Sequence, residues 1–161
     1  MSTGTMRLDP AEFVCSGLDR HFLDNLIGNP LETTRAAGRL IFGGVFDRHP
    51  DLCLQLVHGG GHLVYQLGRM DHAVRIGLVP RPPRRKPSLY ASNLLFDTIL
   101  HSARAVDFLV GVVGADRVTF GSDLPFEMAD AAPASPSADP RPWSNAVLGG
   151  NAVRSFRLKQ N

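Results

Sequence analysis

Cysteine is scarce in this 161-residue sequence, which contains only Cys15 and Cys53. The two lie far apart and form no CxxC pair, which argues against a disulfide framework. Cys53 lies within an apolar run, so we expect a buried free thiol in a reducing compartment. The N-terminal stretch has no apolar core of signal-peptide length, and no run approaches the roughly eighteen apolar residues of a membrane span. We therefore expect a cytoplasmic protein with no membrane partner.

The sequence also has no large excess of charge of one sign. Its net charge is only +2, which gives no reason to expect a nucleic-acid partner. Basic residues gather in one segment, but prolines from Pro80 to Pro87 lie among them and no aromatic residue is interleaved. We interpret this segment as an exposed, stiff loop rather than a phosphate-binding patch. Its basic residues are Arg75, Arg81, Arg84, Arg85 and Lys86.

The sequence also lacks a G-x-S-x-G nucleophile elbow. This absence matters because residues 56–69 read LVHGGGHLVYQLGR, in which His58 ends an apolar run and three glycines follow. An esterase oxyanion loop uses such glycine amides to hold a developing negative charge, but without a nucleophile it has nothing to catalyse. The remaining interpretation is a metal-dependent hydrolase, in which a histidine at the end of a barrel strand faces the reacting centre.

Helical and strand-like segments alternate along the chain, which predicts a parallel α/β architecture. The predicted helices cover 30–49, 61–77, 102–114 and 142–158, and the predicted strands cover 52–57, 88–96 and 117–123. Asn29 should cap the first helix, with Pro30 at its first position and Glu32 completing a capping box. Residues 129–142 are rich in proline and alanine and predict a linker. Three strands make either a small open sheet or part of a larger barrel, since eight strands take roughly 250 residues.

Two polar residues follow predicted strands, His58 after 52–57 and Asp123 at the end of 117–123. Strand ends in parallel α/β folds converge on one face, so we expect these side chains to meet where ligands bind. A carboxylate and an imidazole at that face suit a divalent metal and its water. The alternative is that Asp123 merely caps the next turn, and the spacing alone leaves both interpretations open.

Several motifs, taken in order, make the sequence similar to a known family. They are GNPLETTRAAGRLIFGGVFDRHPDLCLQLVHGGG, then GR, then FDTILHSARAVDFLVGVVGADRVTFGSDLPFE, and finally VLGGNAVRSFRL. Together they resemble the C-terminal half of an amidohydrolase-related family that includes amino-carboxymuconate-semialdehyde decarboxylase and the resorcylate-type decarboxylases. The resemblance covers residues 26–128 and 143–158, matches 1–25 weakly, and implies one truncated domain over 1–161. The implied fold is α/β, a partial metal-dependent-hydrolase (β/α)8 TIM barrel of about the last three strands and their helices, with one divalent metal, often zinc.

The resemblance also implies roles for individual residues. His58 matches the catalytic histidine of the family, and Asp123 matches the strand-end aspartate that binds the metal. Arg69, in the GR after the glycines, matches an arginine that reaches a substrate carboxylate across a subunit interface, which implies a small carboxylate substrate and a homodimer. Asn151 matches a structural asparagine, and Asp97 in FDT is a weaker site candidate.

The sequence departs from the family pattern in its histidines. The family's metal site also needs an H-x-H pair and a third histidine, but none of the six histidines here forms H-x-H. A catalytic zinc takes about three protein ligands, so His62 is considered as a substitute ligand and His101 as a residue at the mouth of the site. The resemblance implies a metal-dependent enzyme, either decarboxylase-like or hydrolytic, and the alternative is a catalytically inactive fragment without the H-x-H ligands.

Overall fold

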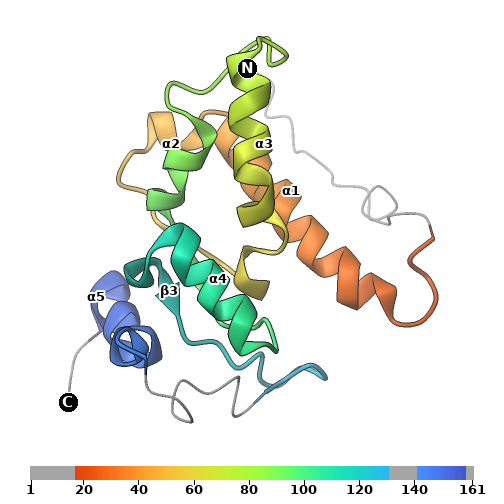
Figure 1. Cartoon of the computed structure of the whole chain (residues 1–161), viewed down its shortest axis with the longest axis vertical. Coiled ribbons are helices and arrows are strands. Elements are labelled where there is room, and N and C mark those ends of the chain that lie inside the picture. Colours follow the sequence, from red (N-terminus) through yellow and green to blue (C-terminus); the bar gives the residue numbers. More distant parts are fainter. Residues whose placement is uncertain (1–16, 131–140, 159–161) are drawn as a thin grey trace, which may run out of the picture.

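The computed structural model describes residues 17–130 and 141–158, in which three strands alternate with helices (Figure 1). The helices are α1 (Asn29–Phe42), α2 (Val45–Arg48), α3 (Leu63–Arg75), α4 (Ala103–Val113) and α5 (Asn151–Phe156). The strands are β1 (Leu54–Leu56), β2 (Leu94–Asp97) and β3 (Val118–Thr119). The predicted parallel α/β architecture is confirmed.

The strands form one parallel sheet in the order β1-β2-β3. Leu56 is in register with Phe96, and Phe96 with Val118, so these apolar side chains share one face of the sheet. Gln55 and Thr119 lie on the opposite face, where the Thr119 hydroxyl donates a 3.0 Å hydrogen bond to Gln55 Oε1 across β2. One face of the sheet is therefore apolar and the other is partly polar.

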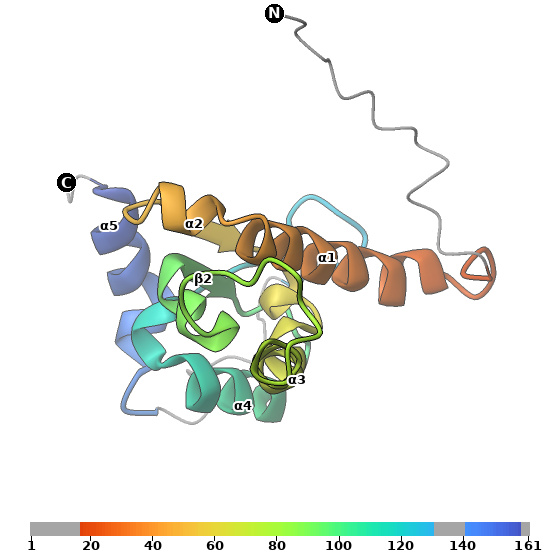
Figure 2. The ribbon, with the colours of Figure 1, turned by 90° about the horizontal axis from the view of Figure 1, so that it is seen from above.

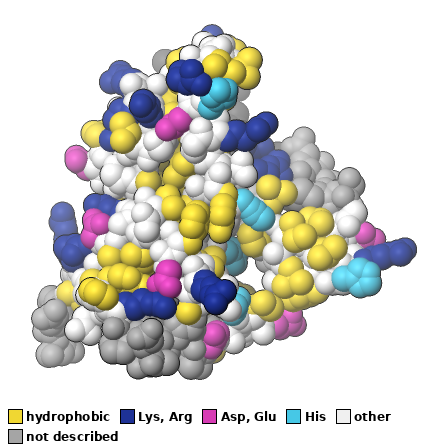
Figure 3. Space-filling model, viewed as in Figure 1, with side chains coloured by type: hydrophobic (Ala, Val, Ile, Leu, Met, Phe, Trp, Pro, Cys, Tyr) yellow, Lys and Arg dark blue, Asp and Glu magenta, His cyan; other side chains and the backbone are white. Residues whose placement is uncertain are grey.

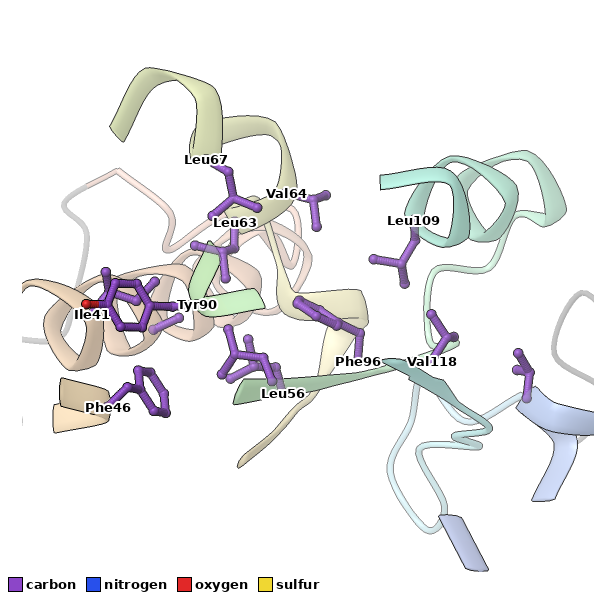
Figure 4. Packing of buried hydrophobic residues seen from close by; sticks show 13 residues of the cluster. Ile41, Phe46, Leu56, Leu63, Val64, Leu67, Tyr90, Phe96, Leu109 and Val118 are labelled. Atoms are coloured by element: carbon purple, nitrogen blue, oxygen red, sulfur yellow. The ribbon is translucent and has the colours of Figure 1, made fainter. Parts of the chain in front are cut away.

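The hydrophobic core lies between the apolar face of the sheet and the helices that surround it. Figure 2 shows α1 and α2 along one side of β2, and α3 and α4 along another. In Figure 4, Leu63 from α3 and Leu109 from α4 approach the side chains of Phe96 and Val118. Leu63, Phe96 and Val118 are fully buried, and each such side chain stabilises the fold by about 1.5–3 kcal/mol. This packing holds the strand ends, and hence the loops that follow them, in fixed positions.

The predicted helix over 30–49 is wrong at Gly43 and Gly44, where the chain turns and divides it into α1 and α2. Gly44 has a φ of +66°, a left-handed conformation that glycine adopts without the strain a side chain would cause. The hydrophobic periodicity continues through this turn, which explains why the sequence suggests one helix.

The predicted capping box at the start of α1 is also wrong. A π-helical turn (Asp24–Gly28) runs directly into α1, so Gly28 stands at the N-cap and no side chain caps the helix. Asn29 lies inside the continuous helical segment, and Glu32 pairs with Arg35 instead. The capping signals fail here because the preceding turn already supplies carbonyl partners for the first amides of α1.

The predicted strand over 88–96 is wrong for its first six residues, which form a 3-10 helix (Pro87–Asn93) before β2. Ser88 donates to Asp71 from both its backbone amide and its hydroxyl, at 2.9 and 2.7 Å. These hydrogen bonds attach the segment to α3, so it does not pair with another strand. The contact with α3 outweighs the alternation of apolar and polar residues that suggests a strand.

Further departures concern the ends of the predicted elements. The structure has shorter strands than predicted for 52–57 and 117–123, and the final helix opens with a π-helical turn (Ala146–Gly150) before α5. The expectation of a buried Cys53 is wrong, since this residue is exposed just before β1. Within the predicted linker, 131–140 lie outside the described residues.

The basic segment that begins at the end of α3 lies on the surface, as the sequence predicts. Arg75, Arg81, Arg84, Arg85 and Lys86 are all exposed. Figure 3 shows lysine and arginine side chains around the outer end of α3, and hydrophobic side chains over α3 and α4. Within the described part of the chain, no helix combines the length and the apolar character that crossing a membrane requires.

Candidate functional site

A cavity of about 490 Å³ lies beside the loops that follow the strands, at the end where their carboxyl termini point. It collects residues from four segments that are far apart in the sequence. Its polar lining comprises Asn25, Asn29, His58, His101 and Asp123. Apolar side chains from the same loops complete the lining, and about half or more of Val57 and Phe126 remains exposed. The predicted meeting of His58 with Asp123 at one face is therefore observed, although 65 positions separate them in the sequence.

Three of the residues lining the cavity have strained backbones. His58, His101 and Asp123 have φ values of +56°, +51° and +57°, in the left-handed region that non-glycine residues seldom occupy. Each such residue costs about 1–3 kcal/mol and persists only where the surrounding structure holds it, which is a common property of functional sites. The same conformation occurs at His21, Phe22 and Arg157 outside the cavity, and aspartate adopts it readily in turns. The Phe126 amide donates to the Asp123 carbonyl at 2.9 Å, so the backbone leaves both interpretations of Asp123 open.

The glycines after His58 are required by close packing of the loop on the end of β2. A Cβ atom on Gly59 would lie 2.5 Å from the Leu100 side chain, and one on Gly60 would lie 2.6 Å from the Phe96 ring. Neither distance is compatible with a real side chain, and Phe96 is fully buried and unable to move aside. The glycines of the HGGG motif therefore let the loop of residues 58–62, called the histidine loop below, pack directly against the core.

The third glycine meets helix α1. A Cβ atom on Gly61 would lie only 2.0 Å from the carbonyl oxygen of Pro30. Beside it, the backbone amide of His62 donates a 2.7 Å hydrogen bond to the hydroxyl of Thr34, which itself donates to the Pro30 carbonyl at 2.9 Å. The loop and the first turn of α1 are thus joined by direct backbone contact and a side-chain hydrogen bond.

The imidazole of His58 has one hydrogen-bonding neighbour in the described part of the chain, the hydroxyl of Thr33 on α1. Thr33 Oγ1 lies 3.3 Å from Nδ1 of His58 and 3.1 Å from the carbonyl oxygen of Asn29, to which it donates. Sequence reasoning missed Thr33, because a threonine inside a helix has no motif that connects it with a histidine 25 positions later. Asn29 itself lines the cavity.

Asp97, the weaker sequence candidate, lies beneath the site rather than in it. It ends β2, is buried, and its Oδ1 accepts hydrogen bonds from the amides of Gly59 at 2.7 Å and Ile99 at 3.1 Å. Burial raises the pKa of the Asp97 carboxyl, while these two amides and the positive charge of His58 act in the opposite direction. Asp97 does not line the cavity, so the structure gives it a supporting position for the histidine loop.

Two other sequence candidates lie outside the cavity of their own chain. Arg69 is exposed on α3, and His62 stands at the N-cap of that helix. Neither is among the residues that line the cavity. Asn151 is fully buried, and its side-chain amide donates to the carbonyls of Ala115 and Val118, both at 2.7 Å. This arrangement agrees with a structural role for Asn151.

The described residues by themselves do not fit a complete catalytic metal site. No group of three or more histidine, cysteine, aspartate or glutamate side chains in 17–130 and 141–158 is arranged to hold an ion, whereas a catalytic zinc takes about three protein ligands. Asp123 lines the cavity together with two histidines, His58 and His101.

Comparison with known proteins identifies relatives of this chain. A family model described as Amidohydrolase matches residues 3–158. The chain is 34% identical, over 163 aligned positions, to 2-amino-3-carboxymuconate-6-semialdehyde decarboxylase of Dictyostelium discoideum. That alignment covers 96% of this chain and 45% of the relative.

Solved structures agree with the sequence comparison. The structure of 5-carboxyvanillate decarboxylase from Sphingomonas paucimobilis matches with a TM-score of 0.76 and 31% identity, covering 88% of this chain and 44% of that one. A 5-carboxyvanillate decarboxylase from Novosphingobium aromaticivorans, complexed with manganese and 4-hydroxy-3-methoxy-5-nitrobenzoic acid, matches with a TM-score of 0.72 and 28% identity, over 80% and 40% of the two chains. The chain thus spans less than half the length of these relatives, and the predicted partial barrel is confirmed.

Proposed function

The chain belongs to the amidohydrolase family, and from that premise we propose that it supplies part of the active site of a metal-dependent decarboxylase acting on an aromatic or unsaturated carboxylate. The observation that carries the proposal is the convergence of His58 and Asp123 on one cavity, each with a strained backbone, at the carboxyl end of a parallel sheet. The similarity to decarboxylases of both carboxymuconate and hydroxybenzoate types supports this reaction over hydrolysis.

In this proposal His58 is the proton carrier. Decarboxylation breaks the bond between the ring or chain carbon and the carboxylate carbon, and its electron pair stays on the former as carbon dioxide leaves. His58 delivers a proton to that carbon, as a general acid within hydrogen-bond reach of the substrate. The exposed apolar rim of the cavity, which includes Phe126, suits a planar apolar ring.

Asp123 is proposed as one ligand of the divalent metal, with the remaining ligands supplied by polypeptide beyond the described residues. The resemblance favours zinc, while a related decarboxylase structure holds manganese. Both ions are therefore included in the test.

Arg69 is proposed to reach the carboxylate of a substrate held by a second copy of the chain. Its exposed position on α3 supports this, because the side chain does not line its own cavity. One helical turn away, Tyr65 is 66% exposed and stacks on Phe108, with ring centroids 4.6 Å apart. Exposed aromatic residues beside an arginine are typical of protein interfaces, and a homodimer through this face is part of the proposal.

The experiment measures carbon dioxide release by the purified chain, with Mn²⁺ or Zn²⁺ added. The substrates are 5-carboxyvanillate and 2,6-dihydroxybenzoate, the second being the compound bound in the structure of a similar 2,6-dihydroxybenzoate decarboxylase. We expect His58→Asn to lower the rate by roughly 10²–10⁴-fold. A matched control is His49→Asn, which changes an exposed histidine at the end of α2, outside the cavity and away from α3, and should leave the rate unchanged. Equal rates for the two variants would contradict the role given to His58.

The second candidate is a catalytically inactive member of the family, and the incomplete ligand set among the described residues favours it. Metal content after dialysis, measured by plasma mass spectrometry, separates the two. A stoichiometric ion that is lost in Asp123→Asn would support the decarboxylase proposal. No bound ion and no turnover would support the inactive protein.

A further inference from the structure

We propose that Thr33 sets the protonation pattern of the His58 ring, holding the neutral imidazole in the tautomer with hydrogen on Nδ1 and a free electron pair on Nε2. Thr33 is a positioning residue in this inference, which rests on the proposed role of His58 as the proton carrier. The tautomer itself is a property of the folded chain and does not depend on turnover.

The hydrogen-bonding capacity of the Thr33 hydroxyl determines the direction of its two contacts. A hydroxyl has one hydrogen to donate and two lone pairs with which to accept. The carbonyl of Asn29, 3.1 Å away, can only accept, so the hydroxyl hydrogen points to it. With the hydroxyl hydrogen engaged there, the 3.3 Å contact between Thr33 Oγ1 and His58 Nδ1 is a hydrogen bond only if the ring hydrogen lies on Nδ1.

The adjacent residue uses the same arrangement with an unambiguous direction. Thr34 Oγ1 lies 2.9 Å from the carbonyl of Pro30 and accepts from the backbone amide of His62 at 2.7 Å. Because an amide only donates, the hydroxyl hydrogen of Thr34 must go to the carbonyl. Two successive threonines therefore face the histidine loop in the same way, each donating to the carbonyl four positions earlier and offering a lone pair to the loop.

The opposite pattern has the Thr33 hydroxyl donating to Nδ1, which would place the ring hydrogen on Nε2. That pattern removes the hydroxyl hydrogen from the Asn29 carbonyl, although threonine in a helix commonly donates to the carbonyl four positions before it. It would also leave Thr33 and Thr34 with opposite donor directions in nearly the same surroundings. The geometry favours the first pattern.

The consequence for the site follows from which nitrogen remains available. Nε2 of His58 has no hydrogen-bond partner among residues 17–130 and 141–158, and His58 lines the cavity. With the hydrogen on Nδ1, Nε2 can take a proton from a group in the cavity and return it to a substrate carbon. With the hydrogen on Nε2, the neutral ring could not accept a proton from the cavity at that atom.

The test records long-range ¹H–¹⁵N correlation spectra of the full, ¹⁵N-labelled chain, at increasing pH until the His58 signals stop moving. His58→Asn identifies the signals by their loss. In the wild type we expect Nδ1 to resonate as a protonated nitrogen and Nε2 as a bare one. The reverse assignment would overturn the proposal.

Two variants at one position separate the hydroxyl from the shape of the side chain. Thr33→Val keeps the branched shape and loses the hydroxyl, and we expect the ratio of the two His58 tautomers to move toward Nε2–H by roughly fivefold, the effect of one hydrogen bond. Thr33→Ser keeps the hydroxyl and should retain the wild-type ratio. An unchanged ratio in Thr33→Val, with the other histidine signals unshifted, would refute the role of Thr33.

These outcomes are distinguishable from failure of the proposed function. A chain that releases no carbon dioxide but shows the Nδ1–H tautomer supports the inference and argues against decarboxylation by this chain. If Thr33→Val does not fold, Thr33→Ala removes the same hydroxyl, and an unchanged tautomer ratio in that variant would refute the role of Thr33.

Discussion

Replacement of Gly61 by alanine tests whether the glycines serve packing or simply provide a flexible loop. The new Cβ atom would lie 2.0 Å from the carbonyl oxygen of Pro30 and 2.8 Å from the hydroxyl of Thr34. Ordinary carbon–oxygen contacts begin near 3.3 Å, so the loop and α1 must separate by more than about 1 Å. This movement breaks the 2.7 Å bond from His62 to Thr34.

The magnitude follows from three costs. The φ of +64° at Gly61 costs an alanine about 1–3 kcal/mol. Overpacking against a backbone atom costs about 1–3 kcal/mol, and the lost hydrogen bond about 1 kcal/mol. Because these costs share one movement they are not fully additive, and we expect a total of roughly 3–5 kcal/mol, a large part of the 5–15 kcal/mol that stabilises a typical domain.

The assay is urea denaturation, and Gly68→Ala is the matched control. Gly68 is exposed in the middle of α3, and a Cβ atom there would meet nothing within 4 Å. Alanine should therefore stabilise that helix by about 0.5–1 kcal/mol. If Gly61→Ala lowers the free energy of unfolding by less than about 1 kcal/mol at an unchanged m-value, the packing explanation is refuted.

Two further perturbations test the supports of the site. Asn151→Ala leaves the buried carbonyls of Ala115 and Val118 without their donor, and should lower the free energy of unfolding by about 2–4 kcal/mol in the same urea assay. For Asp97, the pKa is raised above its ordinary 3.8, so between 3.8 and the raised value the folded chain binds more protons than the unfolded chain. Stability should accordingly fall as the pH rises through that interval. Asp97→Asn keeps an oxygen for the Gly59 amide and should flatten this part of the curve, and an equal slope in both proteins would contradict the assignment.

The sequence predicts the fold well where a single element explains a pattern. The apolar run before His58 becomes β1, and the periodic segment around Arg69 becomes α3. The strand-end rule also brings His58 and Asp123 together correctly. These features depend on local periodicity and on the general geometry of parallel sheets, both of which can be read from one sequence.

The sequence predicts less where a residue's role depends on a distant partner. In the oxyanion interpretation of the HGGG motif, glycine is needed for what its amides offer a ligand. In the structure, the Phe96 side chain of β2, the Leu100 side chain beyond it and the Pro30 carbonyl of α1 fill the space beside these glycines. Thr33 and Asp97 contact the same loop from elements before and after it. Such contacts become visible only when the chain is folded, because nothing in the spacing connects them.

The loop after β1 donates the amide of Gly59 to Asp97 and the amide of His62 to Thr34. A glycine-rich surface loop ordinarily opens on its own, far more often than the domain unfolds. Here two amides within four residues are bonded to side chains on different elements, so the loop can open fully only if it separates from both α1 and the end of β2. Opening of the loop therefore breaks contacts with both elements at once, and we expect the Gly59 and His62 amides to exchange with solvent more slowly than those of an unanchored loop.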